Sequence, residues 1–405
     1  MGLLRLILAL TVVVGHTPTA KLYGLSMLPA GDAVEVFFML SGFYMALILD
    51  QTYRGPGSYG IFIRNRVLRL YPIYAVVLVL TVAVGWYVSV NGYLPDGRVS
   101  VVSGAWWVAP DFLTPFGALL IVILHVTLIG QELPFLFQTS SAGLMDVVTW
   151  GAQPELRTTY AGLQYYLLVP QAWSLGLEML FYLLAPALVR SRLRTVTGVW
   201  AASLGVRTLL QVGTGLMTYN FFAHQFFPLE LWTFATGILG YRFYVAIRGR
   251  EYPPQSFLWA PILLVTLIAG YQYIPFLRNW TLFACAAVLI PCSFHAIGGR
   301  TTVTSKWRFL SAVDAYLGDL SYPVYISQIL VMYGMYMFMS HTNRHWSLAA
   351  ITLTLIVSAI LLVVVQGPID RIRVRNRASI GARPSRAERH RAERRRAASG
   401  RSGAN

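Results

Sequence analysis

The sequence has few charged residues: 12% of its 405 residues are Asp, Glu, Lys or Arg, against about 25% in soluble domains. Hydrophobic residues make up 56% of the chain, and the mean hydropathy is +0.57. A soluble all-α protein is a poor alternative, because its helices should show a polar face. Apolar runs of about 17–22 residues recur instead, the length that spans a bilayer core. The composition therefore predicts an all-α integral membrane protein.

Acidic residues are also scarce, 16 against 32 basic ones, which gives a net charge of +16. This excess does not indicate nucleic-acid binding, since twelve arginines lie between Arg371 and Arg401. We predict a transmembrane domain over residues 1–370 and a basic, disordered cytoplasmic tail over residues 371–405. The tail could bind anionic membrane lipids. An orientation signal and a merely solvated end explain it equally well.

Cysteine is limited to Cys285 and Cys292. Seven residues apart on one predicted helix, they lie about 10 Å apart, too far for a disulfide, so both are expected to pack in the core. No helix carries a pattern of metal ligands, and we predict no metal site. The remaining histidines are scattered over different predicted segments: His125, His224, His295, His341 and His345.

About ten transmembrane helices are predicted from the apolar runs. They are Leu3–Thr19, Ala33–Leu49, Leu68–Ser89, Trp173–Val189, Val196–Met217, Phe226–Ile247, Phe257–Ile274, Trp280–Ile297, Tyr316–Met339 and Ser347–Val365. Basic loops alternate with loops nearly free of basic residues, so the positive-inside rule places every basic loop and both termini in the cytoplasm. We expect a multi-pass protein of the cytoplasmic, or inner, membrane.

The apolar segment Phe112–Ile129 does not fit this alternation. One extra crossing would place the basic loop Arg190–Arg194 on the wrong side, so we interpret the segment as re-entrant or interfacial. A true span paired with a weak one near residues 162–170 is the alternative. The first helix is kept as a span because no small-residue cleavage site follows it.

Ionisable groups inside a membrane are costly and are functional candidates for that reason. Arg5 and His16 are eleven residues apart, which is about 20° past three full helical turns and a rise of about 16 Å. The two side chains should share a face, with Arg5 near the cytoplasmic surface and His16 about half a bilayer away. We expect them to line a common cavity. Alternatively, Arg5 is a snorkelling orientation signal and His16 a satisfied core histidine.

Buried acids are the next candidates. Glu35, at the outer end of the second span, could bind one ring nitrogen of His16 and fix its tautomer. Glu178 lies near the outer end of the fourth span, and a lone buried glutamate is rarely structural. Arg207 lies mid-span and is expected to pair with an acid. Ser41–Gly42 is expected to allow close helix approach rather than to supply a nucleophile.

A basic stretch precedes the third span. Arg64, Arg66 and Arg69 are followed by Tyr71, and Arg66 and Arg69 are i,i+3 neighbours on one helix face. Guanidinium groups match phosphate oxygens. A positive-inside anchor would explain the charge of this stretch but not the pairing. Gly318–Pro323 is either the start of a capped, proline-kinked helix or part of a cofactor pocket.

The motifs occur in a fixed order along the chain. They are Arg5-(ten residues)-His16, Phe37-Phe38-x-x-Ser41-Gly42-Phe43, the Arg64–Pro72 stretch, Trp173-Ser174-Leu175-x-x-Glu178-x-x-Phe181-Tyr182 and Gly318-Asp319-Leu320-Ser321-Tyr322-Pro323-x-Tyr325. The set resembles the acyltransferase 3 family, whose members include bacterial enzymes that O-acetylate surface polysaccharides such as O-antigen. The resemblance covers Arg5 to Pro368 and implies a ten-helix bundle with both ends inside.

The resemblance also implies roles. His16 corresponds to the catalytic histidine of the family, with Arg5 as its partner, and Arg66 and Arg69 to an arginine pair that handles the donor. The expected donor is acyl-CoA, most simply acetyl-CoA, and the expected acceptor is a hydroxyl of a glycan or lipid-linked sugar. The catalytic set is then His16, Arg5, Glu35 and Glu178. The donor-binding set is Arg64, Arg66, Arg69, Tyr71, Ser321 and Tyr322.

Two positions depart from the family pattern. Gln328 stands where many members have histidine, and Gln366–Pro368 replaces a glutamate-basic-proline triplet, so the roles of these positions stay open. A transporter or flippase of a lipid-linked sugar or small anion is the main alternative function, although the chain lacks the internal repeat that many transporters show. A purely structural assembly protein is a third alternative.

Overall fold

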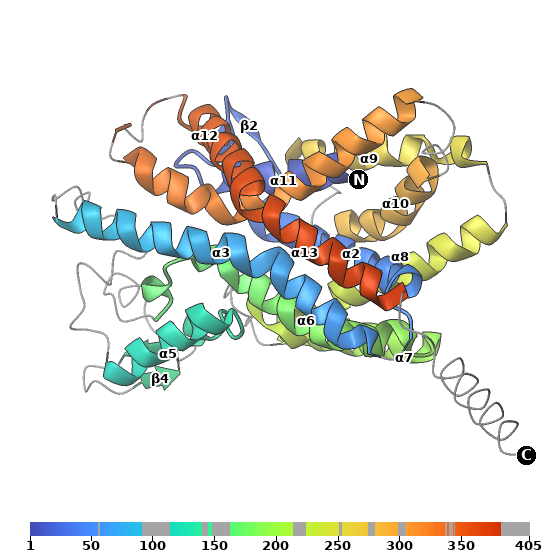
Figure 1. Cartoon of the computed structure of the whole chain (residues 1–405), viewed down its shortest axis with the longest axis horizontal. Coiled ribbons are helices and arrows are strands. Elements are labelled where there is room, and N and C mark those ends of the chain that lie inside the picture. Colours follow the sequence, from blue (N-terminus) through green and yellow to red (C-terminus); the bar gives the residue numbers. More distant parts are fainter. Residues whose placement is uncertain are drawn as a thin grey trace, which may run out of the picture.

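The computed structural model describes residues 1–55, 57–90, 114–139, 145–147, 163–213, 224–250, 253–273, 280–298, 305–336, 338–339, 343 and 345–381. This part of the chain is a bundle of helices (Figure 1). The α-helices are α1 (Gly2–Gly15), α2 (Ala30–Gln51), α3 (Ser58–Val90), α5 (Pro115–Thr127), α6 (Trp173–Arg190), α7 (Leu193–Gly213), α8 (Phe227–Gly249), α9 (Trp259–Gly270), α10 (Trp280–Gly298), α11 (Ser305–Tyr336), α12 (Trp346–Leu361) and α13 (Gly367–Gly381).

Short segments complete the fold. Single 3₁₀ turns lie at Leu133–Leu136, Leu163–Tyr166, Pro170–Ala172, Pro254–Phe257 and Tyr271–Tyr273, and a π-helical segment, Leu362–Gln366, joins α12 to α13. Two antiparallel hairpins are described, β1 (Lys21–Leu22) with β2 (Leu25–Ser26) and β3 (Phe137–Thr139) with β4 (Met145–Val147).

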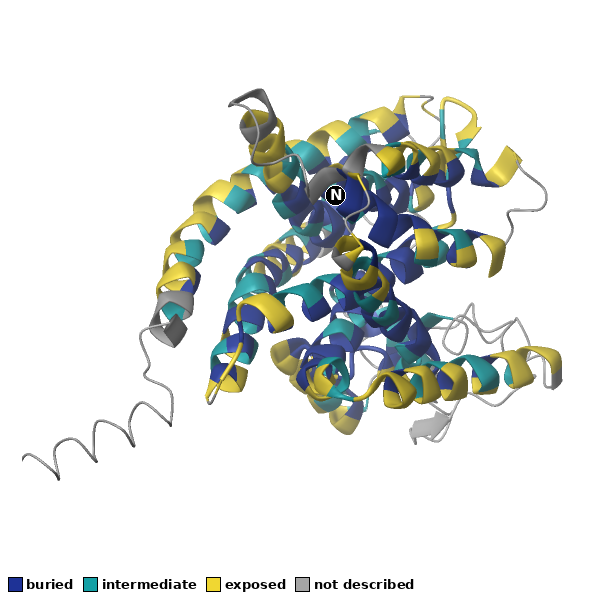
Figure 2. Ribbon diagram, turned by 90° about the vertical axis from the view of Figure 1, so that its right-hand side faces the viewer, coloured by how far each residue is buried: buried dark blue, intermediate teal, exposed yellow. Residues whose placement is uncertain are grey.

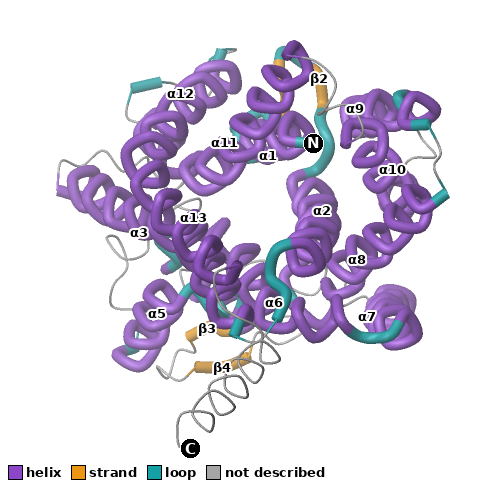
Figure 3. The backbone as a smooth tube through the Cα atoms, turned by 45° about the vertical axis from the view of Figure 1, so that its right-hand side comes forward, coloured by secondary structure: helices purple, strands orange, loops and turns teal. Residues whose placement is uncertain are grey.

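Helix α2 lies closer to the middle of the bundle than the peripheral helices α3, α5, α7 and α12 (Figure 3). It packs along α8 almost backbone to backbone. A Cβ atom on Gly42 would lie 2.0 Å from the carbonyl oxygen of Phe234, and one on Gly237 would lie 2.1 Å from that of Met39. Only glycine allows this separation, which confirms that the Ser41–Gly42 pair is a close-packing site.

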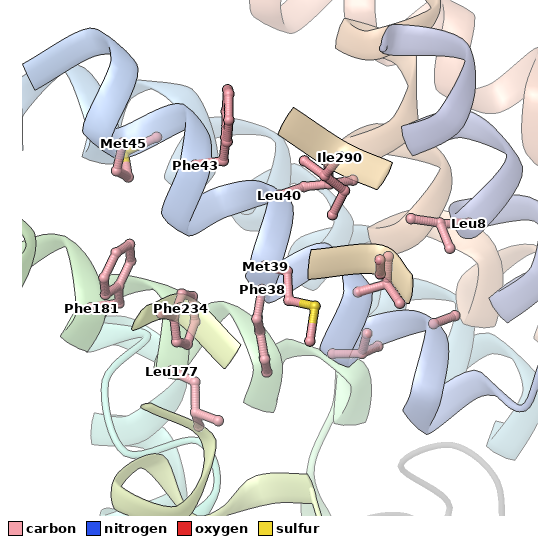
Figure 4. Packing of buried hydrophobic residues seen from close by; sticks show 14 of the residues in the cluster. Leu8, Phe38, Met39, Leu40, Phe43, Met45, Leu177, Phe181, Phe234 and Ile290 are labelled. Atoms are coloured by element: carbon pink, nitrogen blue, oxygen red, sulfur yellow. The ribbon is translucent and has the colours of Figure 1, made fainter. Parts of the chain in front are cut away.

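Aromatic side chains fill the space between α2, α6 and α8 (Figure 4). The ring of Phe234 stacks on Phe38 at 4.5 Å and on Phe181 at 4.3 Å between centroids. Aromatic pairs at such distances add about 0.5–1.5 kcal/mol beyond the burial of their area. The core also takes up Cys292, and both cysteines are free thiols, as their spacing predicted.

The outward faces of the peripheral helices are exposed (Figure 2), and they carry many large apolar side chains. Val79, Leu209, Ile262 and Val363 are examples of side chains that no other part of the described chain covers. Continuous exposed apolar surface of this kind marks contact with a membrane or a partner. On bundled helices this long, the fitting surroundings are lipid.

Four helical stretches are long and apolar enough to cross a membrane: Ala30–Gln51, Ser58–Tyr87, Pro170–Arg190 and Trp346–Asn376. Shorter apolar helices lie at Gly2–Gly15, Pro115–Thr127, Trp259–Tyr273 and Trp280–Ala296. The membrane-protein class and its helical architecture are thereby confirmed. The count of ten spans and the cytoplasmic location of both termini stay predictions.

Three helix boundaries differ most from those predicted. Helix α3 begins at Ser58 rather than Leu68, and α11 begins at Ser305 rather than Tyr316. At the other end of the chain, α13 continues to Gly381, so residues 371–381 are helical rather than part of a disordered tail. The reason is packing: α13 lies against α3, and the Asn376 side chain donates a 3.0 Å hydrogen bond to that of Asn65. Residues 382–405 lie outside the described part.

Helix α5 covers most of the segment predicted to be re-entrant or interfacial. Its 13 residues reach about 20 Å, less than the roughly 30 Å of a hydrocarbon core. The Tyr71 and Tyr74 hydroxyls of α3 donate to the carbonyls of Val126 and His125, which attaches α5 to the side of the bundle. A short helix in this position agrees with a segment that does not cross.

Candidate functional site

Two cavities lined by described residues lie between the helices. The first, which we name the arginine cavity, has a volume of about 330 Å³. Its charged and polar lining comes from α1, α2, α3, α6, α11 and α13 and comprises Arg5, Ser41, Arg66, Arg69, Ser174, Glu178, Asp314, Asp319, Ser321, Tyr322 and Arg373. Four arginines face three acids here, so the wall carries an excess of positive charge suited to a multiply charged anion.

The arginines are held in different ways. Arg69 Nη1 lies 2.9 Å from Asp319 Oδ1, and Arg373 binds Asp370. The Arg5 guanidinium lies 5.4 Å from the centroid of the Tyr44 ring, a distance typical of cation–π contacts. Guanidinium groups fixed by acids and rings lose little further freedom when a phosphate binds them.

Glu178 belongs to the arginine cavity. Its Oε1 accepts a hydrogen bond of 2.7 Å from the Ser41 hydroxyl and another from the Tyr182 hydroxyl. We expected Glu178 near the outer end of its span and in the catalytic set with His16. The structure places it among the arginines and not in the cavity that His16 lines, because its position on α6 faces α2 and the arginine-bearing part of α3.

The motif Gly318–Pro323 lies inside α11 rather than at its start. Ser321 and Tyr322 both line the arginine cavity, with the Ser321 hydroxyl donating to the Gly318 carbonyl at 2.7 Å and the Tyr322 hydroxyl to the Leu70 carbonyl at 2.5 Å. The motif therefore does not begin a helix, and it lines a cavity; a role in binding a cofactor stays a prediction. The rest of the wall is mainly apolar and includes Val34, Phe37, Phe38, Met45, Ile48 and Leu175.

Two residues expected in the same site lie elsewhere. Arg64 is exposed on α3, and the Tyr71 hydroxyl donates to the Val126 carbonyl of α5 at 2.8 Å; neither lines the arginine cavity. The helical period explains this, since Arg64 precedes Arg66, and Tyr71 follows Arg69, by two residues or about 200°. Of these four residues, only Arg66 and Arg69 line the cavity.

The second cavity, which we name the histidine cavity, has a volume of about 400 Å³. Its polar and aromatic lining comprises His16, Asp32, Phe135, Gln171, Trp173, His224, Gln225 and Tyr325. His16 follows the last residue of α1, is half-buried, and has its Nδ1 2.8 Å from the Val12 carbonyl oxygen. A carbonyl can only accept, so Nδ1 carries the proton and the lone pair of Nε2 remains for chemistry.

A buried ionic network lies behind the histidine cavity. Arg207 donates to Glu35 at 2.6 Å and also binds Glu230, and the three side chains are 7%, 1% and 0% exposed. The expectation that Arg207 pairs with an acid is confirmed. Glu35 does not bind His16 as predicted: its Oε1 accepts from Arg207 and from Nδ1 of His224, at 2.9 Å, while His16 Nδ1 binds its own helix.

Glu35, Glu230 and His224 also form a three-residue group whose potential ligand atoms lie within 4.8 Å of one another. Both carboxylates already accept hydrogen bonds from the Arg207 guanidinium, which offsets one of their two negative charges. A metal ion would have to compete with that cation. The absence of a metal site stays a prediction.

The two cavities share Val34 and Tyr325. The Tyr325 hydroxyl lies 2.7 Å from the hydroxyl of Ser174, a residue of the arginine cavity, and 3.0 Å from the carbonyl oxygen of Gln171, a residue of the histidine cavity. We call Tyr325 and these two contacts the partition. Arg5 and His16 therefore line two adjoining cavities rather than the single cavity expected, because the side chain of Tyr325 reaches in from α11 between them.

Sequence reasoning missed the places of Arg373 and His224. Arg373 is one of several arginines at alternate positions, a pattern that reveals no helix face, and His224 carried no neighbouring motif. Gln328, the departure from the family pattern on α11, is completely buried with no partner for its side-chain oxygen or nitrogen in the described part of the chain. Gln366, the other departure, donates to Asp370 at 2.9 Å.

Comparison with known proteins gives one match. A family model described as an acyltransferase domain, the model of the acyltransferase 3 family, matches residues 1–365. No curated protein and no solved structure matches the chain. The family match covers every residue that lines the two cavities except Arg373.

Proposed function

Because the chain belongs to the acyltransferase 3 family, we propose that this membrane acyltransferase moves an acyl group, most simply acetyl, from cytoplasmic acyl-CoA to a hydroxyl of an extracytoplasmic or lipid-linked glycan. The observation that carries the proposal is the pair of adjoining cavities. One is rich in arginine, the other contains an imidazole with a free lone pair, and Tyr325 lies between them. We place the protein in the inner membrane.

The arginine cavity suits the donor. Its phosphates would bind Arg66, Arg69 and Arg373 at the charged end, since guanidinium groups bind phosphate oxygens in a bidentate manner. The apolar part of the lining, which includes Phe37 and Met45, suits the pantetheine arm. That arm would carry the thioester along the cavity to the partition, where Tyr325 also faces the side of His16.

The reactive atom on the protein is His16 Nε2. It can remove the proton of the acceptor hydroxyl while the hydroxyl oxygen attacks the thioester carbonyl, the C–S bond breaks and the CoA thiolate leaves. It can also attack the carbonyl itself and hold the acyl group until the acceptor arrives. Both routes need Nε2 unprotonated, which the bond from Nδ1 to the Val12 carbonyl favours.

The histidine cavity suits a hydroxylated acceptor. Asp32, Gln171 and Gln225 bring hydrogen-bonding groups to its wall, and Trp173 adds an aromatic ring. Pockets with an apolar body and a few convergent polar groups are typical of small-molecule sites. A sugar ring, with hydroxyls at its edge and apolar faces, fits that combination.

The test is acyl transfer by purified protein from radiolabelled acetyl-CoA to native membranes of cells that lack the gene. We expect transfer and free CoA with the wild type and neither with His16→Ala. His345→Ala is the matched control, because His345 is exposed and contacts Tyr23, away from both cavities. Full activity of His16→Ala would refute the mechanism, and transfer of a sugar across the membrane without CoA release would favour the transporter.

A further inference from the structure

The histidine cavity contains two imidazoles, and their partners differ. His16 donates from Nδ1 to a neutral backbone carbonyl, that of Val12, at 2.8 Å. His224, 29% exposed, donates from Nδ1 to a carboxylate, Glu35 Oε1, at 2.9 Å. In both rings Nδ1 is thus occupied, and Nε2 is the nitrogen left for a substrate.

The two partners suit the rings to opposite tasks. A carboxylate stabilises the imidazolium ion that forms when a histidine takes up a proton, as in catalytic triads, whereas a backbone carbonyl contributes much less to that charge. The network behind His224 strengthens the effect. Three carboxyl groups, those of Glu35, Glu230 and Asp32, stand against the one positive charge of Arg207, so acidic groups outnumber cationic groups around His224.

A nucleophilic imidazole must instead stay uncharged. His16 can attack a thioester only while Nε2 is unprotonated, and in the described part of the chain it has no carboxylate on its ring to favour the charged form. His16 is also continuous with α1, the helix that carries Arg5 into the arginine cavity. Of the two rings, His16 is therefore the better nucleophile and His224 the better base.

We propose that the two histidines divide the reaction: His16 carries the acyl group, and His224, held by Glu35, removes the proton of the acceptor hydroxyl. This inference rests on the proposed function. First, His16 Nε2 attacks the thioester carbonyl, the C–S bond breaks, and CoA leaves as a thiolate that takes a proton from water. Then the acceptor oxygen attacks the acyl carbon, its proton passes to His224 Nε2, and the bond to His16 breaks, which restores neutral His16. His224 finally releases its proton to water, which balances the proton that the CoA thiolate took up.

Gly31 lies against the edge of the His224 ring that carries Nε2. A Cβ atom at Gly31 would lie 3.1 Å from Nε2 and 3.2 Å from each of the ring carbons Cδ2 and Cε1, and Gly31 lines the same cavity. A larger residue would therefore crowd this edge of the ring, whereas the contact with Glu35 is made by Nδ1. The chain thus offers two perturbations of His224, the substitutions His224→Gln and Gly31→Val.

The experiment separates the two steps with labelled acetyl-CoA as donor and native membranes lacking the gene product as acceptor. Without membranes, the wild type should release about one CoA per chain and retain a label that hydroxylamine removes. His224→Gln and Gly31→Val should keep this burst, which also reports a folded donor site. Transfer to membranes should fall about 100-fold or more in both, and added imidazole should restore part of it in His224→Ala. The control is His345→Gln, expected to match the wild type.

Several results would overturn the division of roles. The wild type could transfer label to membranes yet release no burst of CoA when membranes are left out. The acyl group would then pass directly from CoA to the acceptor, so the proposed function would stand and this inference would fail. If His224→Gln transfers label at a rate close to that of the wild type, His224 is not the base. If His224→Gln and Gly31→Val both lose the CoA burst as well as the transfer, His224 is needed for the donor step or for folding. This result would also overturn the inference. Failure of the proposed function itself would show differently, as a wild type that neither releases CoA nor transfers label.

Discussion

Arg373 offers the sharpest test of the donor site, because the sequence suggested another role for it. The arginines from Arg371 onward looked like a lipid-binding or orienting tail, yet α13 turns Arg373 into the arginine cavity, where the residue is 5% exposed. Its neighbours Arg371 and Arg375 on the same helix are exposed. Replacing Arg373 by glutamine removes one positive charge from inside the cavity. Replacing Arg371 or Arg375 by glutamine removes the same charge from the same helix, but outside the cavity.

The expected effect of Arg373→Gln on donor binding follows from the contacts of Arg373. A hydrogen bond to a charged group contributes about 1.5–3 kcal/mol, and about 1.4 kcal/mol corresponds to a tenfold change in affinity. Arg373 already binds Asp370, so a phosphate would share it, and the lower end of the range applies. We expect Arg373→Gln to raise KM for acetyl-CoA about tenfold with little change in kcat, the signature of lost binding that is equal in ground and transition state.

The assay is acetyl transfer to native membranes over a range of acetyl-CoA concentrations, at low and at moderate salt. Arg371→Gln and Arg375→Gln should change KM less than about threefold, because exposed charges contribute little and salt screens them. If all three variants raise KM equally, the cavity position of Arg373 is irrelevant and the tail acts through its overall charge. If none changes KM, Arg373 does not bind the donor.

Two further predictions concern stability, measured as thermal unfolding of the purified protein in detergent. Gly42→Ala should lower the free energy of unfolding by about 1–3 kcal/mol or more, because the added Cβ would lie 2.0 Å from a carbonyl oxygen of α8. Gly334→Ala is the control and should have little effect, because no atom lies within 4 Å of the added Cβ. Equal effects of the two substitutions would contradict the close packing of α2 on α8. Arg207→Met should cost about 3–5 kcal/mol by leaving two buried carboxylates uncompensated. The triple variant that also carries Glu35→Gln and Glu230→Gln should recover most of the loss, and failure to do so would refute the charge argument.

The class of the protein could be predicted from the sequence, because it depends on composition and on the length of apolar runs. The same holds for features that arise within one helix. Arg66 and Arg69 face the arginine cavity together because of their i,i+3 spacing, and the close approach at Gly42 follows from the absence of a side chain. Period and residue size alone determine such features.

Features that depend on how helices pack could not be predicted. Glu35 binds His224 rather than His16, although nothing in the sequence separates the two histidines as partners. The partition arises because Tyr325 on α11 reaches the start of α6, more than a hundred residues away in the chain. Likewise, Arg373 enters the site because α13 packs against α3, a contact that includes the hydrogen bond between Asn376 and Asn65, 311 residues apart in the chain.

The central claim is that the donor's phosphates bind in the arginine cavity while its thioester reaches His16 past Tyr325. An experimental density map of the protein with an unreactive thioether analogue of acetyl-CoA tests it most directly. The account predicts phosphates on Arg66, Arg69 and Arg373 and the analogue's carbonyl carbon within about 3–3.5 Å of His16 Nε2, the separation of a near-attack geometry. A nucleotide bound outside this cavity, or an acyl end that stops on the arginine side of a closed partition, would contradict it.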